Sequence, residues 1–242
     1  MLVLVRHGEA TANAAGLLLG RSDVPLTEKG FRQVAALRGH LGMVARVVSS
    51  PLRRARDTAE ALDLGLPIEV DRRWVEVDYG AHEGQALTAV PAEVWRHWRA
   101  DPDFHPPGGE SLADVGRRVR AACEELFADR GGPPDAGRAR PGPGGSAGGS
   151  TRDSTRDSAA GPVVDDPAVG GARSTGGDVV VVSHVSPIKA AVAWALETGD
   201  EVAWRLHLST GSVTRIGWGV AGPLVHCFNW SPDAGHPAQP PR

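Results

Sequence analysis

The stretch Leu-Val-Leu-Val-Arg-His-Gly-Glu occupies residues 2–9, so that four apolar residues lead directly into a cation and an imidazole. A short aliphatic run of this kind is typical of a strand buried on both faces of a parallel sheet. Open α/β sheets bind ligands beyond the carboxyl ends of such strands. Arg6 suits an anion because guanidinium can hold phosphate through two hydrogen bonds, and a neutral His7 offers a lone pair as nucleophile. The stretch therefore predicts an anion-binding site at the start of an α/β domain.

Hydrophobic patterns along the rest of the chain predict alternating strands and helices. Further strands are expected at residues 44–49, 68–71, 179–183, 212–217 and 224–229. Helical apolar stripes follow Thr27, Pro51, Ser111 and Pro187, of which Thr27 and Ser111 are expected N-caps. The alternation predicts a three-layer α/β/α sandwich with a central, mostly parallel sheet.

Residues 130–177 differ from the rest of the chain in composition. Roughly four residues in ten are Gly or Pro, and Thr-Arg-Asp-Ser occurs twice in tandem, at 151–154 and 155–158. Such a segment has too few apolar side chains to build a core. We expect a disordered insertion, either a tether or an interaction or phosphorylation segment, within a single domain spanning 1–242 that ends in a flexible tail at 231–242.

Charge and cysteine content narrow the class of protein. The formal net charge of −3 gives no field that would recruit nucleic acid or an anionic membrane, so neither is an expected partner. Cys123 and Cys227 are far apart among apolar residues, which indicates reduced thiols. The first strand leaves no room for a signal peptide, and no apolar stretch approaches 18 residues. A cytoplasmic location is expected.

Several separated motifs share one family pattern. They are Arg6-His7-Gly8-Glu9 with Asn13, residues 20–30, residues 47–55, Trp74-Val75-Glu76-Val77-Asp78-Tyr79-Gly80, Glu83-Gly84 and residues 179–184. In this order they closely resemble the histidine phosphatase superfamily, the phosphoglycerate mutase-like group. The resemblance covers all but residues 130–177 and the last dozen. It implies the fold derived above, with a small helical lid, and a small phosphorylated substrate.

The resemblance implies a phosphohistidine route in which His7 attacks phosphorus. The other nitrogen of its ring must then keep a proton and donate it to an acceptor such as a backbone carbonyl. Arg6 and Arg53 are the expected clamps on the non-bridging phosphate oxygens. Helix starts after Ser50 and Ser186 are expected to add backbone N–H donors.

Three more residues take roles from the same resemblance. Asn13 is expected to be a neutral phosphate donor, and His184, protonated against the dianion, completes the ring of positive charge. Glu76 matches the glutamate of a Glu-x-x-Tyr-Gly pattern and is expected to protonate the leaving group and later activate water. A carboxylate in a loop can also be an ordinary surface residue.

Neighbouring charged residues are given supporting roles. Glu9 and Glu83 either line the pocket or orient the two clamping arginines by ion pairing, and we favour ion pairing. Arg54 and Arg56, on the same helix as Arg53, are expected to be solvated. Ser49 and Ser50 stand at a strand-to-helix turn without a Gly-x-Ser-x-Gly elbow, so helix capping is their expected function.

The resemblance places Trp95, His97, Trp98, Arg99, His105 and the turn at 106–111 in a lid over the pocket, where we expect the aromatic rings to pack rather than touch substrate. The nine histidines show no closely spaced His-Glu-x-x-His or Cys-x-x-Cys pair. A phosphohistidine route with arginine clamps needs no divalent ion. We therefore expect neither a metal nor another cofactor.

Three functions remain open: a metal-independent phosphomonoesterase, a phosphoglycerate mutase-type phosphoryl transferase and a non-catalytic phospholigand-binding module. Glu83-Gly84 resembles the form typical of the phosphatases, whereas a mutase would have Gln-Gly and a lysine-bearing stretch. The chain has lysine only at Lys29 and Lys189. We therefore favour the phosphatase over the mutase, and the presence of both His7 and Glu76 argues against a non-catalytic module. The oligomeric state is left open.

One departure from the family pattern follows His184, where glycine is usual and Val185-Ser186-Pro187 stands here. Valine restricts the approach of backbone to a ligand, and proline lacks an amide donor. The segment resembles the variant in actinobacterial phosphatase domains attached to ribonuclease H, where α-ribazole phosphatase-like activity is inferred. α-Ribazole phosphate is therefore a candidate substrate, beside a broad range of small phosphate esters.

Overall fold

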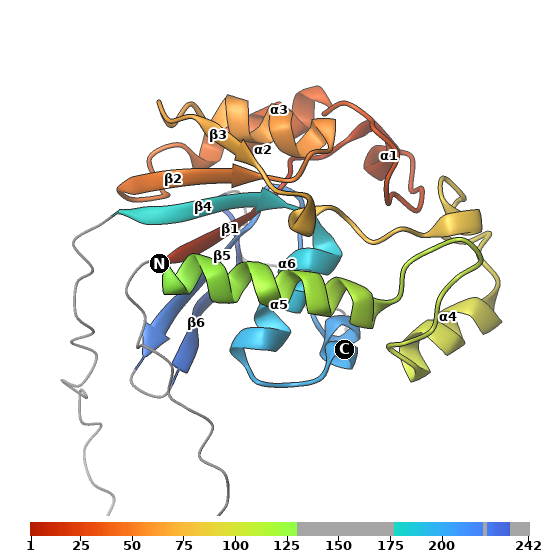
Figure 1. The fold of residues 1–242 in the computed structure, drawn as a ribbon. Helices are drawn as coiled ribbons and strands as arrows, with labels where there is room; N and C mark the ends of the chain where they lie inside the picture. Colours follow the sequence, from red (N-terminus) through yellow and green to blue (C-terminus); the bar gives the residue numbers. More distant parts are fainter. Residues whose placement is uncertain (130–176, 220–221, 233–242) are drawn as a thin grey trace, which may run out of the picture.

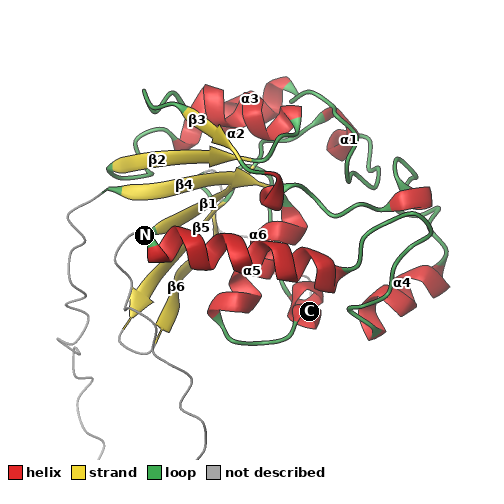
Figure 2. Ribbon diagram, viewed as in Figure 1, coloured by secondary structure: helices red, strands yellow, loops and turns green. Residues whose placement is uncertain are grey.

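The computed structural model describes residues 1–129, 177–219 and 222–232 (Figure 1). The expected insertion at 130–177 lies outside these ranges except for Gly177, and the expected tail at 231–242 lies outside them except for Ser231 and Pro232. The described residues form one sheet with helices on both faces (Figure 2). This confirms the predicted three-layer α/β architecture.

Six strands make the sheet in the order β3-β2-β4-β1-β5-β6. They are β1 (Leu2–Arg6), β2 (Val44–Ser49), β3 (Ile68–Val70), β4 (Asp178–Ser183), β5 (Val213–Gly219) and β6 (Gly222–Trp230). The first four strands pair in parallel, β5 is antiparallel to β1, and β6 is antiparallel to β5. The carboxyl ends of β1, β2 and β4 therefore meet at one edge of the sheet.

The long helices divide between the two faces of the sheet. Side chains of α2 (Glu28–Leu37) and α3 (Arg53–Leu62) form one buried apolar cluster with Val3, Val5 and their neighbours in the sheet. Those of α5 (Leu112–Ala128) and α6 (Val185–Ala195) form another with Leu2 and Leu4 (Figure 1). The alternation of residues along β1 thus supplies both cores.

The helix starts follow the predicted caps with one exception. Thr27 accepts a hydrogen bond from the Gly30 amide at 3.0 Å, and Ser111 accepts one from Asp114 at 3.1 Å, in a capping box. The fourth helix was expected to start at Pro187 but starts two residues earlier, at Val185. Proline is tolerated in a first turn because the amide that it lacks has no partner inside the helix.

Shorter elements lie on the carboxyl side of the sheet. They are α1 (Thr11–Ala14), α4 (Ala92–Ala100) and the 3₁₀ turns η1 (Arg72–Trp74), η2 (Gly80–His82) and η4 (Asp200–Arg205). Figure 1 shows α4 on the side toward which the arrowheads of β2 and β4 point. Its Trp98 is buried and meets Tyr79 edge-on at 5.6 Å between ring centroids. Trp98 therefore packs as the sequence predicts.

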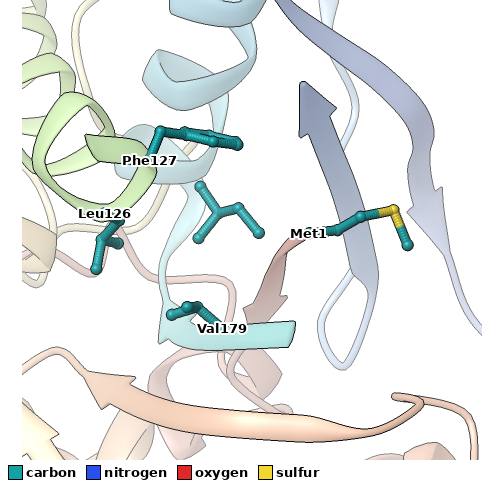
Figure 3. A pocket seen from close by; sticks show the side chains of 5 residues that line it. Met1, Leu126, Phe127 and Val179 are labelled. Carbon is teal, nitrogen blue, oxygen red and sulfur yellow. The ribbon is translucent and has the colours of Figure 1, made fainter. Parts of the chain in front are cut away.

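Both cysteines are free, and Cys123 is buried on α5, where burial raises the pKa of its thiol. The amino-terminal edge of the sheet holds a small hollow whose lining is entirely apolar (Figure 3). It is lined by Met1, Leu2, Leu126, Phe127 and Val179. This hollow offers no polar group for chemistry, in contrast to the opposite edge. No helix within the described ranges is both long and apolar enough to cross a membrane.

Two glycines allow the segment after β1 to cross α2 at backbone contact. A Cβ on Gly8 would lie 2.8 Å from the Gly30 carbonyl carbon, and a Cβ on Gly30 would lie 2.9 Å from the Glu9 amide nitrogen. Real Cβ atoms essentially never approach backbone so closely. The position of His7, immediately before Gly8, therefore depends on this crossing.

We expect Gly30→Ala to lower the free energy of unfolding by about 2 kcal/mol, because the added methyl group overpacks a backbone contact. Helix propensity alone predicts the opposite sign, a gain of about 1 kcal/mol. Urea unfolding of the variant measures the sign. Arg32→Ala, at an exposed position of the same helix, is the control and should change stability by no more than about 0.5 kcal/mol. A more stable Gly30→Ala protein would contradict the contact.

Candidate active site

Three strand ends bring distant residues together at the carboxyl edge. The His7 amide donates to the Ser183 carbonyl at 3.0 Å, and the Ser50 amide donates to the Val182 carbonyl at 3.0 Å. These bonds continue the pairing of β4 with β1 on one side and with β2 on the other. The rings of His7 and His184 consequently lie 5.1 Å apart, centroid to centroid.

The hydrogen bonds of His7 determine its tautomer. Its side chain is buried, Nδ1 lies 2.7 Å from the Gly8 carbonyl oxygen, and Nε2 lies 3.2 Å from Nε of Arg54. The carbonyl can only accept and the guanidinium can only donate. Nδ1 therefore carries the proton, and Nε2 presents a lone pair. Burial, Arg54 and Arg6 hold the pKa of His7 well below its usual value, so the ring is neutral.

Arg54 is the guanidinium in contact with His7, which corrects the prediction that it is solvated. It is fully buried and also donates from Nη1 to the Ser22 carbonyl at 2.8 Å and from Nη2 to the Gly20 carbonyl at 2.7 Å. Burial lowers its pKa, and the nearby Glu76 carboxylate opposes that shift. The first turn of α3 thus delivers a fixed cation to the nucleophile candidate.

Arg53 takes a different place from the predicted one. Its side chain is 56 % exposed and pairs with Asp57, one turn along α3, at 3.4 Å. The structure therefore does not bring Arg53 to His7. Helical periodicity could have found the difference, because Arg54 lies four residues before buried Thr58, whereas Arg53 lies four before charged Asp57. The predicted solvation of Arg56 is confirmed.

Arg6 adds a second cation at the end of β1. Its Nη1 donates to the Leu208 carbonyl at 2.5 Å, while its buried Nε has no hydrogen-bond partner in the part of the chain that the structure describes. Burial lowers the pKa of Arg6 to about 10, so it remains charged at neutral pH. A buried donor without a partner is costly, and an anion would satisfy it.

His184 lies on the other side of His7 and is fully buried. Its Nε2 lies 2.7 Å from the Ser50 hydroxyl, and its Nδ1 has no partner among the described residues. Burial and Arg54 hold the pKa of His184 well below its usual value. The ring is therefore neutral in the free protein, in contrast to the protonated form expected beside a bound dianion.

Glu76 is buried, and both of its carboxylate oxygens are occupied. Oε1 accepts from the amides of Val77 at 2.8 Å and Ser186 at 3.1 Å, and Oε2 accepts from Val185 at 3.0 Å. The first amides of α6 therefore bind Glu76. The sequence predicts that this helix start donates to phosphate, but in the free protein the Ser186 amide is already bound to Glu76. The Glu76 carboxylate, held by a helix N-terminus, also explains why α6 starts at Val185.

Two smaller expectations concern Asn13 and Ser50. Asn13 lies in α1 and accepts from the Ala10 amide at 3.1 Å through Oδ1. The Ser50 hydroxyl accepts from the Leu52 amide at 3.3 Å, at the turn before α3, and contacts His184. The N-cap of α3 is Leu52, without a side-chain cap, so Ser50 does not cap this helix as expected and instead bonds within the preceding turn and contacts His184.

The predicted ion pairs of Glu9 and Glu83 with the clamping arginines are not formed. Glu9 instead pairs with Lys29 at 2.7 Å, and Glu83 binds the backbone amides of Gly20 and Ser22 at 3.0 Å. Both carboxylates find nearer donors, which sequence order alone does not reveal. Within residues 1–129, 177–219 and 222–232, no group of three His, Cys, Asp or Glu side chains is arranged to hold a metal ion.

The two buried histidines predict a pH-dependent stability. The unfolded chain binds protons on His7 and His184 near pH 6.5, whereas the folded chain does so only at lower pH. Stability therefore falls on acidification below pH 6.5, by up to about 1.4 kcal/mol per pH unit for each histidine. Urea unfolding between pH 6.5 and 5.5 measures this slope.

His184→Gln should reduce that slope by up to about 1.4 kcal/mol per pH unit, because one titrating group is gone. His207→Gln, at an exposed position, is the matched control and should leave the slope unchanged. An equal slope in the wild type and in His184→Gln would show that His184 is protonated in the folded protein.

Comparisons with known proteins find relatives of similar sequence. A "Bifunctional protein" of Mycobacterium tuberculosis is 36 % identical over 221 residues, which are 88 % of this chain and 49 % of the relative. The chain thus spans about half the length of that relative. A glucosyl-3-phosphoglycerate phosphatase of Mycobacterium tuberculosis is 37 % identical over 134 residues, covering 52 % of this chain and 60 % of the relative.

Solved structures extend the likeness to the whole fold. The mycobacterial glucosyl-3-phosphoglycerate phosphatase in complex with VO3 is 28 % identical, with a TM-score of 0.71 over 95 % of this chain and 99 % of that chain. The family model described as "Histidine phosphatase superfamily (branch 1)" matches residues 2–133 and 170–231. These two ranges include the three strand ends and the residues that they bring together, and the chain belongs to the histidine phosphatase superfamily.

Proposed function

We propose that the chain is a metal-independent phosphomonoesterase that hydrolyses small phosphate esters through a phosphohistidine on His7. The observation that carries this proposal is the neutral, buried ring of His7, whose lone pair on Nε2 accepts a hydrogen bond from the Arg54 guanidinium. Nε of Arg6 and Nδ1 of His184, which have no hydrogen-bond partner among the described residues, add two more buried polar atoms. An anionic group placed there would satisfy all of them.

The proposed first step transfers the phosphoryl group to the protein. Glu76 takes up a proton as the substrate binds. Nε2 of His7 then attacks phosphorus, the phosphorus–oxygen ester bond breaks, and Glu76 gives that proton to the departing alkoxide. The proton stays on Nδ1 of His7, and its hydrogen bond to the Gly8 carbonyl stabilises the positive ring that forms. Arg6 and Arg54 balance the charge that spreads over the non-bridging oxygens.

The second step restores the free protein. Glu76 takes a proton from water, which attacks phosphorus and breaks the bond to Nε2, so that inorganic phosphate leaves and His7 is neutral again. Asn13 is proposed to donate to a phosphate oxygen through its amide nitrogen, since its oxygen is held by Ala10.

The contacts of the lysines favour hydrolysis over phosphoglycerate mutase-type transfer. A mutase must hold the carboxylate of its substrate with cations near the phosphate. Lys29 pairs with Glu9 at 2.7 Å, and Lys189 donates to the Ala203 carbonyl at 2.8 Å. Both lysines are thus engaged within the protein. The presence of His7 and Glu76 in one site argues against a module that only binds phospholigands.

We expect the wild-type protein to release inorganic phosphate from a panel that includes 3-phosphoglycerate and α-ribazole phosphate. A rapid quench should find acid-labile phosphate on the protein, and His7→Ala should abolish both the turnover and the labelling, because the attacking atom is gone. His207→Gln, at an exposed position, should behave as wild type.

Phosphorus NMR distinguishes the alternatives. If 2-phosphoglycerate appeared in place of free phosphate, the chain would be a mutase, and hydrolysis retained by His7→Ala would exclude His7 as the nucleophile.

The two adjacent arginines provide a sharp comparison. Arg54→Ala should lower kcat/KM by about 10²–10⁴-fold, because a buried cation at the transition state is lost. Arg53→Ala should stay within about threefold of wild type, since the side chain is 56 % exposed and pairs with Asp57. Steady-state kinetics of both variants on the same phosphate ester measures the two kcat/KM values. A large loss in Arg53→Ala beside a mild one in Arg54→Ala would contradict the assignment of the clamp to Arg54.

A further inference from the structure

Glu83 binds the same backbone segment as Arg54 and takes no part in the proposed chemistry. Both of its carboxylate oxygens lie 3.0 Å from the Gly20 amide, and Oε1 also accepts from the Ser22 amide at 3.0 Å. Hydrogen bonds of this kind, with an ionised acceptor, are about twice as strong as neutral ones. The carboxylate therefore fixes the backbone of residues 20–22 from one side.

The same residues face Arg54 with their carbonyl groups. Gly20 and Ser22 accept from Nη2 and Nη1 of Arg54 at 2.7 and 2.8 Å, and Nε of Arg54 reaches His7 at 3.2 Å. Each of the two residues thus donates its N–H to Glu83 and accepts with its C=O from Arg54. A shift of the segment would move the guanidinium relative to Nε2 of His7.

Close packing leaves little freedom in this arrangement. A Cβ on Gly20 would collide with the Glu83 carboxylate and would lie 2.6 Å from the Val77 carbonyl oxygen. Arg21 lies between Gly20 and Ser22 in the chain, and its Nε donates to the Glu76 carbonyl at 2.8 Å. The segment is therefore held by Glu83 on one side and by the Glu76 backbone on the other.

We propose that Glu83 is a positioning residue that holds residues 20–22 so that the carbonyls of Gly20 and Ser22 direct the Arg54 guanidinium against His7. The inference rests on the proposed function, because Arg54 matters only if phosphate is transferred at His7. The charge of Glu83 also compensates the buried cation, which is costly to bury alone.

Glu83→Gln keeps the size of the side chain and removes its charge and one acceptor. We expect the rate of phosphohistidine formation in a single turnover to fall by about tenfold or more, because misplaced catalytic groups cost rate. Glu69→Gln is the matched control. The Glu69 carboxylate accepts from Nε and Nη2 of Arg46 at 3.0 and 2.8 Å on the exposed surface. This variant should keep the wild-type rate.

A double-variant cycle shows whether Glu83 acts through Arg54. On an Arg54→Lys background, Glu83→Gln should slow phosphohistidine formation by no more than about twofold. Equal slowing on both backgrounds, or a wild-type rate in Glu83→Gln alone, would overturn the proposal.

Exchange of the Arg54 Nε–H proton, followed by nitrogen-15 NMR, gives a readout that does not depend on catalysis. Exchange should quicken in Glu83→Gln and stay slow in Glu69→Gln, and slow exchange in both would overturn the inference. If the wild type formed no phosphohistidine, the proposed function would fail. The NMR comparison would still test whether Glu83 holds the Arg54 guanidinium in place.

Discussion

The hydrogen bond from Arg54 to His7 requires a guanidinium that is fully buried at the carboxyl edge of the sheet. Removing such a cation from water costs several kcal/mol unless its donors find good acceptors. Two backbone carbonyls of residues 20–22 and the lone pair of His7 provide them. The fold around the three strand ends therefore holds a charge and a lone pair together before any phosphate arrives.

Backbone contacts maintain this arrangement at each strand end. Gly8 and Gly30 allow the segment after β1 to cross α2, and the Gly8 carbonyl then fixes the tautomer of His7. At the end of β4, the first amides of α6 hold the Glu76 carboxylate beside His184. Donors and acceptors are thus placed by main chain, so the site needs little reorganisation as charge develops.

Strand positions were largely predictable because buried parallel strands are short aliphatic runs, and β2 matches its expected bounds, 44–49. The convergence of His7 and His184 followed from the rule that ligands bind at carboxyl strand ends. The sequence did not reveal that Arg54, rather than Arg53, contacts His7. This depends on how α3 is rotated about its axis, and Arg54 was wrongly predicted to be solvated. The partners of Glu83 depend on tertiary contacts with residues more than sixty positions away.

The protonation state of His7 tests the central claim most directly. Nitrogen-15 NMR of histidine-labelled protein at pH 7, with His7→Ala used to assign the resonance, distinguishes the two neutral tautomers and the imidazolium form. The account predicts a neutral ring that is protonated at Nδ1, with the lone pair on Nε2, in the free protein. An imidazolium, or a proton on Nε2, would mean that the atom proposed to attack phosphorus is not available.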